Sequence, residues 1–255
     1  MHRRTASWLV ATLLVLALGA SPAAAVPLVQ LGFLVDGSGS ITPGNFETIK
    51  TGIANAFQNV LPTDGSVEVT VVRFDTTASV VVSPTVIDSA MALDAVVSAI
   101  GGMSYFGGWT NMPEAIDLLT GQVQSSAVYG AAPIVYNMVT DGLPVLNGMD
   151  LTAQTVAARD AAVGAGLDEF DVEFIGSTLS PGYSFLLNEL VYPQPGHSAP
   201  PYTPGFVVPV TFDNFEQAFE SKLIAVTNPV PEPGTLLLLG AGLLGLGARV
   251  RRRRP

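Results

Sequence analysis

Oxygen-bearing side chains recur at three places in the sequence, in a pattern that suits a hard metal cation. Asp36-Gly37-Ser38-Gly39-Ser40 follows one apolar run, Thr140-Asp141-Gly142 follows another, and Gly107-Gly108-Trp109-Thr110-Asn111 lies between them. Two carboxylates balance a divalent charge, while neutral hydroxyls add ligands without quenching it, and this donor set suits octahedral Mg²⁺. The candidate metal-ligating residues are therefore Asp36, Ser38, Ser40, Thr110 and Asp141.

The elements that must position these residues are β-strands alternating with helices. Leu28–Val35 is a continuous apolar run that ends at Asp36, which is typical of a central strand buried on both faces. A comparable run precedes Thr140 and Asp141. The predicted strands are Leu28–Val35, Val67–Phe74, Ala78–Val82, Ile134–Val139, Phe170–Ile175 and Phe206–Phe212.

Apolar residues at helical spacing predict helices between these strands, within residues 42–60, 88–100, 111–123, 151–165, 183–190 and a last segment from 213. Thr42 is placed to cap the first helix. Two pairs, Asn111 with Glu114 and Asp213 with Glu216, resemble capping boxes. The side chains expected to face the core are Phe46, Ile49, Ile53, Phe57, Val60, Ile116, Leu119, Val123, Phe215, Phe219 and Leu223.

Strands that alternate with helices predict an α/β fold, a doubly wound and mostly parallel central sheet with helices on both faces. Only Asp75–Thr77 separates the second and third strands, so these two must form an antiparallel hairpin at a sheet edge. Ligand sites in such sheets lie at the carboxyl ends of the strands, where Asp36 and Asp141 occur. The proline-rich segment 191–205 does not fit the alternation and is expected to be a long surface loop, with His197 solvated within it.

D-x-S-x-S after the first strand, a lone Thr in a later loop and Asp-Gly after the fourth strand together resemble the metal-ion-dependent adhesion site (MIDAS) of von Willebrand factor type A (VWA) domains. The resemblance includes the order of the elements and the antiparallel edge strand, and it covers most of residues 28–226. It implies that a sixth metal position accepts an acidic group from a partner. It also implies that the hydroxyls of Ser38, Ser40 and Thr110 bind the metal directly. The carboxylates of Asp36 and Asp141 would contact it largely through water.

Each part of this motif also has an ordinary structural interpretation. DGSGS is a common turn composition, Thr110 is placed to cap a helix, and Asp141 is placed to begin an Asp-Gly turn. The coincidence of all three at strand ends favours the metal site. Segment 191–205 has no clear counterpart in the family and is a candidate for adjusting the choice of ligand.

The first 25 residues are typical of a secretory signal peptide. Arg3-Arg4 precedes the apolar run Trp8–Ala20, and Ala23-Ala24-Ala25 follows it. We expect signal peptidase to cleave after this alanine triplet, which leaves a VWA-like domain over residues 26–230. A retained signal anchor is the alternative, although the run is shorter than the roughly 20 residues that a spanning helix needs.

Residues 231–255 resemble the PEP-CTERM sorting signal of bacterial exported proteins. Pro231-Glu232-Pro233 leads into the apolar stretch Thr235–Ala248, and a cluster of arginines follows. The resemblance implies processing by an exosortase-type membrane protease and transient membrane association through the tail. The arginines are expected to stay cytoplasmic, which places the domain outside. An uncleaved tail that anchors the protein as a transmembrane helix is the alternative.

Charge is divided unevenly between the domain and the two terminal segments. The whole chain has a net charge of −10 and a mean hydropathy of +0.44. Residues 26–230 carry 20 acidic and only four basic side chains, a net charge of −16. Such a domain repels phosphate, which argues against a nucleic-acid partner. The sequence has no cysteine, so disulfides are excluded.

Sequence motifs of common enzyme classes are missing. The DGSGS segment does not meet the G-x-G-x-x-G fingerprint, because Thr42 stands where the third glycine would be, and the sequence has no G-x-x-x-x-G-K-[ST] loop. Residues 26–230 contain one histidine, His197, and no G-x-S-x-G elbow. A Mg²⁺ ion can activate water, but no recognisable general base accompanies the candidate site. We therefore expect a protein that is not an enzyme.

The sequence predicts an exported binding module that holds Mg²⁺, with Mn²⁺ or Ca²⁺ as alternatives, and captures an acidic protein or polysaccharide. Its expected location is the cell envelope or extracellular matrix of a Gram-negative bacterium, with transient or retained inner-membrane anchoring and a role in adhesion, surface assembly or biofilm. Two alternatives stay open. One is a structural matrix protein whose metal only staples loops, and the other is a non-catalytic subunit of an enzyme assembly.

Overall fold

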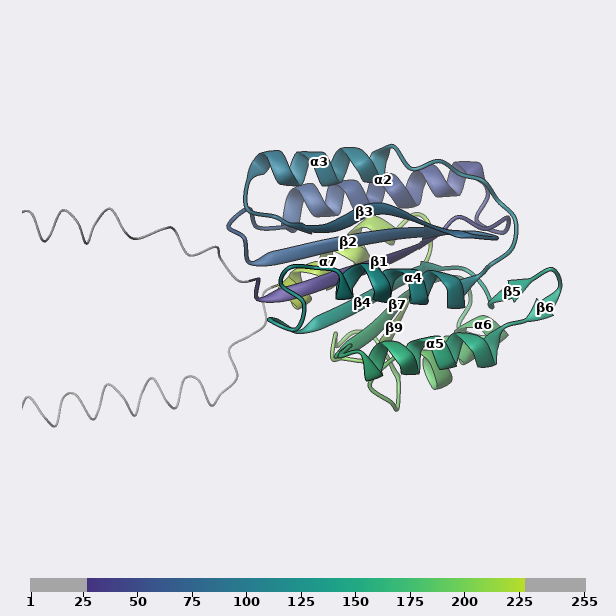
Figure 1. Cartoon of the computed structure of the whole chain (residues 1–255). Coiled ribbons are helices and arrows are strands. Elements are labelled where there is room, and N and C mark those ends of the chain that lie inside the picture. The colour runs from purple at the N-terminus through teal and green to yellow at the C-terminus, as the bar shows by residue number, and fades with distance from the viewer. Residues whose placement is uncertain (1–26, 228–255) are drawn as a thin grey trace, which may run out of the picture.

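The central sheet contains seven strands in the order β3-β2-β1-β4-β7-β9-β8 (Figure 1). The computed structural model describes residues 27–227, so the predicted signal peptide and sorting tail lie outside the described residues. Within the sheet only β3 runs antiparallel to its neighbour, as predicted for this edge. The strands are β1 (Val29–Asp36), β2 (Val67–Phe74), β3 (Ala78–Val86), β4 (Ile134–Thr140), β7 (Glu169–Ile175), β8 (His197–Ser198) and β9 (Phe206–Val210).

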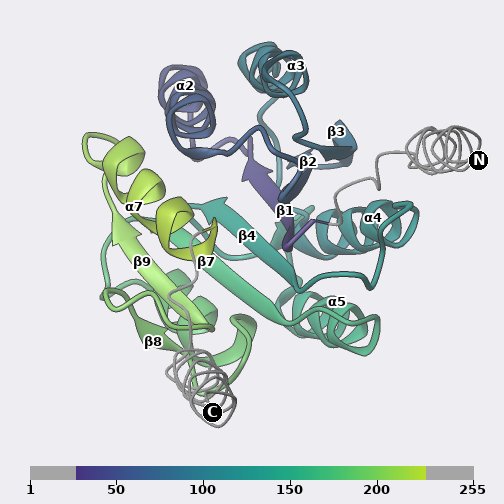
Figure 2. The same ribbon diagram turned by 90° about the vertical axis from the view of Figure 1, so that its left-hand side faces the viewer.

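Helices cover both faces of the sheet, which confirms the doubly wound α/β fold (Figure 2). One face is covered by α2 (Pro43–Val60), α3 (Ala90–Gly101) and α7 (Phe215–Thr227). The other is covered by α4 (Met112–Gln124), α5 (Thr152–Gly164), α6 (Pro181–Phe185) and the π-helical turn η1 (Leu186–Leu190).

Successive residues of the central strands belong to opposite hydrophobic layers because side chains alternate across a sheet. On β1, Phe33 and Val35 pack into the layer beneath α2, whereas Leu34 packs into the layer beneath α4. Ten of the eleven predicted core-facing helix residues are buried, and Val60 is half-buried. The seven-stranded sheet and both hydrophobic layers described here lie within residues 27–227.

The predicted capping interactions are not formed in any of the three helices. Thr42 adopts a positive φ of 67°, and its side chain does not cap α2. Asn111 donates from Nδ2 to Glu114 Oε2 and to the Thr76 carbonyl, and it makes no side-chain cap at α4. Before α7, the side chain of Asn214 rather than that of Asp213 accepts a hydrogen bond, from the amide of Thr211.

The proline-rich segment 191–205 is not only a surface loop. His197 and Ser198 form β8, which pairs in parallel with β9 and extends the sheet. Val191 and Ala199 are buried. His197 is half-buried, and its imidazole contacts the Thr203 hydroxyl, so its expected solvation is also wrong. Backbone pairing, which side-chain patterns in a proline-rich segment do not reveal, holds this segment in place.

No helix within residues 27–227 is both long and apolar enough to cross a membrane. The transmembrane helix considered for the tail falls in residues 231–255, outside the described residues. The carboxyl ends of the parallel strands lie on the right of Figure 1, and the first and last described residues lie at the opposite edge. The segments before residue 27 and after residue 227 are therefore attached at the end of the sheet opposite the carboxyl ends of the parallel strands.

Candidate metal centre

Asp36 is the last residue of β1, and its carboxylate is completely buried. Its Oδ1 accepts a hydrogen bond of 2.8 Å from the Ser38 amide, which folds the chain back directly after the strand. Its Oδ2 accepts a hydrogen bond of 2.6 Å from Thr140 Oγ1 at the end of β4. Parallel pairing aligns Val35 with Val139, so the next residues of both strands come together at the same edge.

Two serines continue from Asp36 towards the second carboxylate. The hydroxyls of Ser38 and Ser40 lie 3.2 Å apart, and Ser40 Oγ donates to Asp141 Oδ1 over 2.7 Å. Four of the five predicted residues therefore form one hydrogen-bonded chain, Asp36–Ser38–Ser40–Asp141. Ser38 is buried, Asp141 is half-buried and Ser40 is exposed, so the chain leads from the interior to the surface.

Thr110 reaches this edge through backbone contacts of its loop. The Gly39 amide donates to the Gly108 carbonyl (2.9 Å), and the Gly107 amide donates to the Gly37 carbonyl (3.2 Å), so the two glycine-rich loops are bonded together. Thr110 itself pairs with Val145. In the described part of the chain, no hydrogen bond joins the Thr110 hydroxyl to the other four residues.

The loop that carries Thr110 packs at Gly108 against the turn between β2 and β3. The φ of Gly108 is +98°, a conformation that other residues rarely adopt. A Cβ at this position would lie 2.3 Å from Thr76 Oγ1, which already accepts a hydrogen bond from the Trp109 amide. The glycine is therefore required both by the backbone conformation and by the lack of space.

Residues that were not among the predicted ligands hold the ligand-bearing strands and loops in place. Thr140 bonds to Asp36, and the only sequence signal was its place next to Asp141. Arg73 donates to Asp75 Oδ2 (2.7 Å), and the Asp75 carbonyl accepts from the amide of Asn111, the residue after Thr110. An Arg two residues before an Asp at a strand end was the available signal for this pair. A small hairpin, β5 (Val145–Leu146) with β6 (Met149–Asp150), was also not predicted.

Both carboxyl groups of the site hold their protons more tightly than exposed carboxyls do. Burial raises the pKa of Asp36 to about 7, although hydrogen bonds from Thr140 and Ser38 oppose the rise. Burial also raises the pKa of Asp141, and the hydrogen bond from Ser40 lowers it in part. A divalent cation placed between them would favour the charged forms of both.

The donor set fits a hard cation. The described residues contain no group of three or more His, Cys, Asp or Glu side chains that could hold a metal, so a centre here depends on hydroxyl oxygens beside its two carboxylates. Such a set resembles the oxygen environments of Mg²⁺ more than the nitrogen and sulfur environments of Zn²⁺. That these five residues bind a metal stays a prediction.

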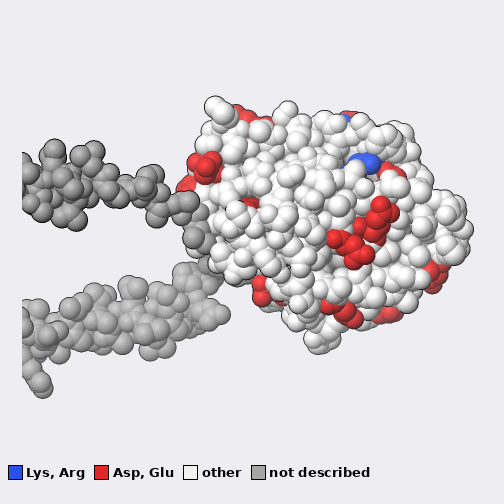
Figure 3. Space-filling model, in the orientation of Figure 1, with Lys and Arg blue, Asp and Glu red and all other residues white. Residues whose placement is uncertain are grey.

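Aromatic side chains border the site. The Tyr105 hydroxyl lies 3.4 Å from the Ser38 carbonyl, while Phe106 and Trp109 are exposed on either side of Gly107 and Gly108. Arg73 packs over the Phe106 ring at 4.3 Å from its centroid. On the face of the molecule shown in Figure 3, acidic side chains form several groups and very few basic atoms are visible. An anionic ligand would therefore meet a mainly negative surface.

Family comparisons match two parts of the sequence. The von Willebrand factor type A domain family matches residues 30–166, and the PEP-CTERM protein-sorting motif matches residues 229–253. No curated protein matches the sequence.

Solved structures with the same fold include three informative ones. The pilus adhesin SpaC from Lactobacillus rhamnosus GG has a TM-score of 0.60 and 15% identity, over 79% of this chain and 30% of its own. A von Willebrand factor type A protein from Catenulispora acidiphila has a TM-score of 0.60 and 16% identity, over 80% and 43%. Proximal thread matrix protein 1 from the mussel byssus, with a zinc-occupied MIDAS motif, has a TM-score of 0.56 and 17% identity, over 79% and 46%. The chain thus spans less than half of each, and these likenesses show the fold alone.

Proposed function

Because the chain belongs to the von Willebrand factor type A domain family, we propose that it is an exported, non-enzymatic module that captures acidic ligands through a divalent cation. Mg²⁺ is the proposed cation, with Mn²⁺ and Ca²⁺ as alternatives. Ser38, Ser40 and Thr110 would bind it directly, and Asp36 and Asp141 would supply the balancing charge. The bound cation would act as a Lewis acid that accepts one carboxylate oxygen from the ligand.

The observation that carries this proposal is the hydrogen bond from Ser40 to Asp141, which joins the ends of β1 and β4 across the sheet edge. Ser40 is exposed and Asp141 is half-buried, so a cation held beside them is open to solvent on one side. Asp36 and Thr140 fix the buried side of the same arrangement through their 2.6 Å hydrogen bond. A site with a fixed buried side and a solvent-exposed side suits a cation whose one open coordination position accepts a ligand.

The charge of the domain supports a cation-dependent mode of binding. Residues 26–230 have a net charge of −16, so an acidic protein or polysaccharide would be repelled unless a cation lay between the two. Two structural neighbours, a pilus adhesin and a thread matrix protein, are compatible with this role.

The sorting motif supports export. Its match to residues 229–253 directly follows the domain, and residue 227 lies at the sheet edge opposite the candidate centre. We propose that signal peptidase and an exosortase-type protease process the two ends, and that the protein reaches the cell envelope or extracellular matrix of a Gram-negative bacterium. The centre would then lie at the end of the sheet opposite the point where the tail is attached.

Thermal melting tests the metal claim. Residues 26–230, purified without a histidine tag and treated with EDTA, are expected to melt at a higher temperature after Mg²⁺ is added, because a cation that binds only the folded state stabilises it. Ser40→Ala and Asp36→Ala should remove this rise. Ser125→Ala is the matched control, because Ser125 is also exposed but bonds to the Gln122 carbonyl at the far end of α4. Equal melting temperatures with and without Mg²⁺ would contradict the proposal.

Ligand capture requires a second measurement. Immobilised polygalacturonate and polyglutamate are expected to retain the wild-type domain in Mg²⁺ and to release it in EDTA, and Ser40→Ala should not be retained. Mg²⁺-dependent melting without retention on either polymer would favour a matrix protein in which the metal only staples loops. Retention that EDTA leaves unchanged would show that capture does not depend on the cation.

A further inference from the structure

Three buried polar residues face one another between the sheet and α7. Asn137 lies on β4, Glu173 on the neighbouring β7 and Lys222 on α7, and their exposed fractions are 2%, 0% and 3%. Asn137 is paired with Asp171 across the two strands, two residues before Glu173, so Asn137 and Glu173 point to the same face of the sheet. Helix α7 covers that face.

These residues hold most of the unsatisfied polar atoms of the interior. In residues 27–227, seven buried side-chain nitrogen and oxygen atoms have no hydrogen-bond partner. Five of them are Asn137 Nδ2 and Oδ1, Glu173 Oε1 and Oε2, and Lys222 Nζ. An unsatisfied buried polar atom costs roughly 1–3 kcal/mol, so five in one place require an explanation.

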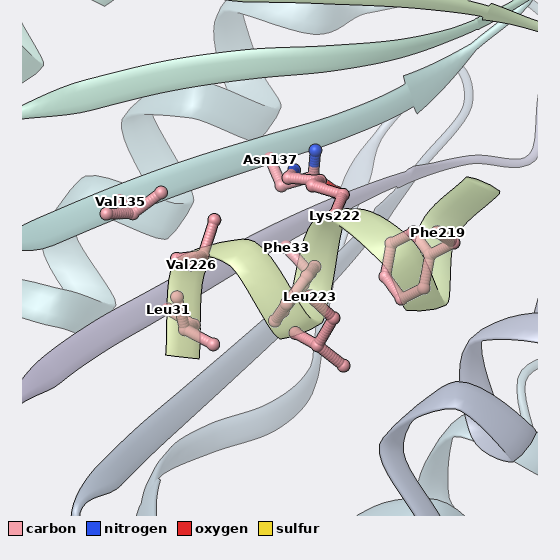
Figure 4. Close-up of a pocket in the computed structure, with 8 residues that line it drawn as sticks. All are labelled: Leu31, Phe33, Val135, Asn137, Phe219, Lys222, Leu223 and Val226. Atoms are coloured by element: carbon pink, nitrogen blue, oxygen red, sulfur yellow. The ribbon is translucent and has the colours of Figure 1, made fainter. Parts of the chain in front are cut away.

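Lys222 lies next to both of the other groups. Lys222 Nζ lies 3.4 Å from Glu173 Oε1. Lys222 and Asn137 line the same small cavity of about 10 Å³, and Figure 4 shows their nitrogen atoms next to each other. The other lining residues are apolar and include Phe33 and Phe219. The cavity has room for about one water molecule, so the amine and the carboxamide meet in a nearly dry space.

We propose that Lys222 and Asn137 become joined by an amide bond between Nζ and Cγ in the folded protein, with Glu173 as the acid–base group. An amine, a carboxamide and a carboxyl group are the components of a transamidation, and the fold brings one of each together. Proximity in a fixed geometry replaces the activation that this reaction needs between free molecules.

The reaction balances without an oxidant or cofactor. A proton passes from the Lys222 ammonium to the Glu173 carboxylate, and burial favours this transfer because it removes two charges. The Nζ lone pair then forms a bond to Asn137 Cγ while the carbonyl electrons move to Oδ1. Glu173 accepts a second proton from Nζ as it donates its own to Nδ2. The C–Nδ2 bond breaks, the carbonyl forms again, and ammonia leaves.

Other features of the site suit this role for Glu173. Burial raises the pKa of Glu173, although Lys222 opposes the rise, so its carboxyl group is able to hold the proton that it takes from the amine. Asp171, the other acidic residue on this face near Lys222, already accepts hydrogen bonds at Oδ1 from the amides of Gly205 and Phe206. Within residues 27–227 neither carboxylate oxygen of Glu173 has a hydrogen-bond partner, and its neighbour of opposite charge is Lys222 itself.

The bond would fasten α7 to the centre of the sheet. The chain has no cysteine, so it cannot form a disulfide. An amide between residues 137 and 222 would instead close a long loop of the chain covalently, and reductants would not break it. This inference is independent of the proposed metal site, which lies at the carboxyl ends of β1 and β4.

Tryptic digestion of the full-length chain under denaturing conditions, followed by tandem mass spectrometry, tests the bond. Arg73, Arg159 and Lys222 are the relevant cleavage points, so peptide 74–159 contains Asn137 and the next peptide begins at residue 160. We expect these two peptides to be linked, lighter than their sum by one ammonia molecule, with no cleavage after Lys222. Separate peptides with normal cleavage after Lys222 would overturn the proposal. So would a loss of ammonia from peptide 74–159 alone, since that indicates cyclisation of an asparagine.

Variants test the role of each group. Lys222→Arg keeps the positive charge but provides no amine nucleophile, and it should abolish the link. Glu173→Gln keeps the size of the side chain but cannot relay protons, and it should reduce the linked fraction at least tenfold. Lys50→Arg is the matched control, because Lys50 is also largely covered but pairs with Glu47 on α2, away from Asn137, and this variant should leave the link intact. A full yield of the link in Glu173→Gln would refute the acid–base role, and the wild-type digest remains decisive if a variant does not fold.

Discussion

Thr140 Oγ1, on β4, donates a 2.6 Å hydrogen bond to Oδ2 of Asp36 at the end of β1, and both residues are completely buried. The hydroxyl holds the carboxylate in one orientation, with Oδ1 turned to the Ser38 amide. Ser38 and Ser40 then lead from this fixed point to Asp141 at the surface. The geometry of the candidate centre therefore depends on a residue that was not among its predicted ligands.

Replacement of Thr140 by valine is expected to weaken both the fold and the centre. The substitution keeps the shape but removes a buried hydrogen bond, and the free energy of unfolding should fall by about 1–3 kcal/mol in urea denaturation. Mg²⁺ affinity, measured by calorimetry, should also fall because Asp36 loses its orientation. Thr155→Val is the matched control, since Thr155 is equally buried but bonds to the carbonyl of Leu151, the residue that precedes α5. Unchanged affinity in Thr140→Val would show that Asp36 needs no such support.

Gly108→Ala is expected to lower Mg²⁺ affinity about tenfold, or about 1.4 kcal/mol, without altering a ligand. The new methyl group would collide with Thr76, and φ of +98° disfavours alanine, so the loop that carries Thr110 must shift. Calorimetric titration measures the loss. Gly121→Ala in α4 is the control, because nothing lies within 4 Å of its Cβ position. That variant should keep the affinity and gain about 0.5–1 kcal/mol of stability from helix propensity.

The stability of the metal-free domain is expected to fall as the pH rises from about 4 to 7. Burial raises the pKa of Asp36 from 3.8 to about 7, so the folded state binds this proton more tightly than the unfolded state does. The contribution is fully present below the unfolded value and is lost as the pH rises through the folded one, up to about 4 kcal/mol in all. Urea denaturation at several pH values measures the slope. Asp36→Asn should flatten it, and an unchanged slope in that variant would assign it to other groups.

Ser40 and Asp141 are expected to act together in metal binding. Ser40→Ala and Asp141→Ala each remove one partner of the 2.7 Å hydrogen bond that joins the two strand ends. Calorimetry of both single variants and the double variant should give a double-mutant coupling of about 1 kcal/mol in Mg²⁺ affinity, because residues in contact are not additive. If the losses of Mg²⁺ affinity in the two single variants simply add in the double variant, the two residues contribute to metal binding independently.

Several predictions failed where the partner of a side chain was not adjacent in sequence. Asn111 and Glu114 have the spacing of a capping box, yet Asn111 also bonds to Thr76, and Glu114 accepts from the amide of Ala78. Small polar side chains bond to whichever group tertiary packing brings nearest, so local spacing alone predicts them poorly. The same reason explains β8, which exists because the proline-rich segment lies beside β9.

The sequence by itself determined the alternation of strands and helices, the faces that they bury and the five candidate ligands. Those features depend on periodicity and on short motifs, which express local backbone geometry and the removal of apolar surface from water. Only the tertiary structure decided which polar groups meet: Ser40 with Asp141, Thr140 with Asp36, and Lys222 with Glu173 and Asn137. Each of these contacts joins residues that strand order and register bring together from distant parts of the chain, and no local pattern of side chains specifies that pairing.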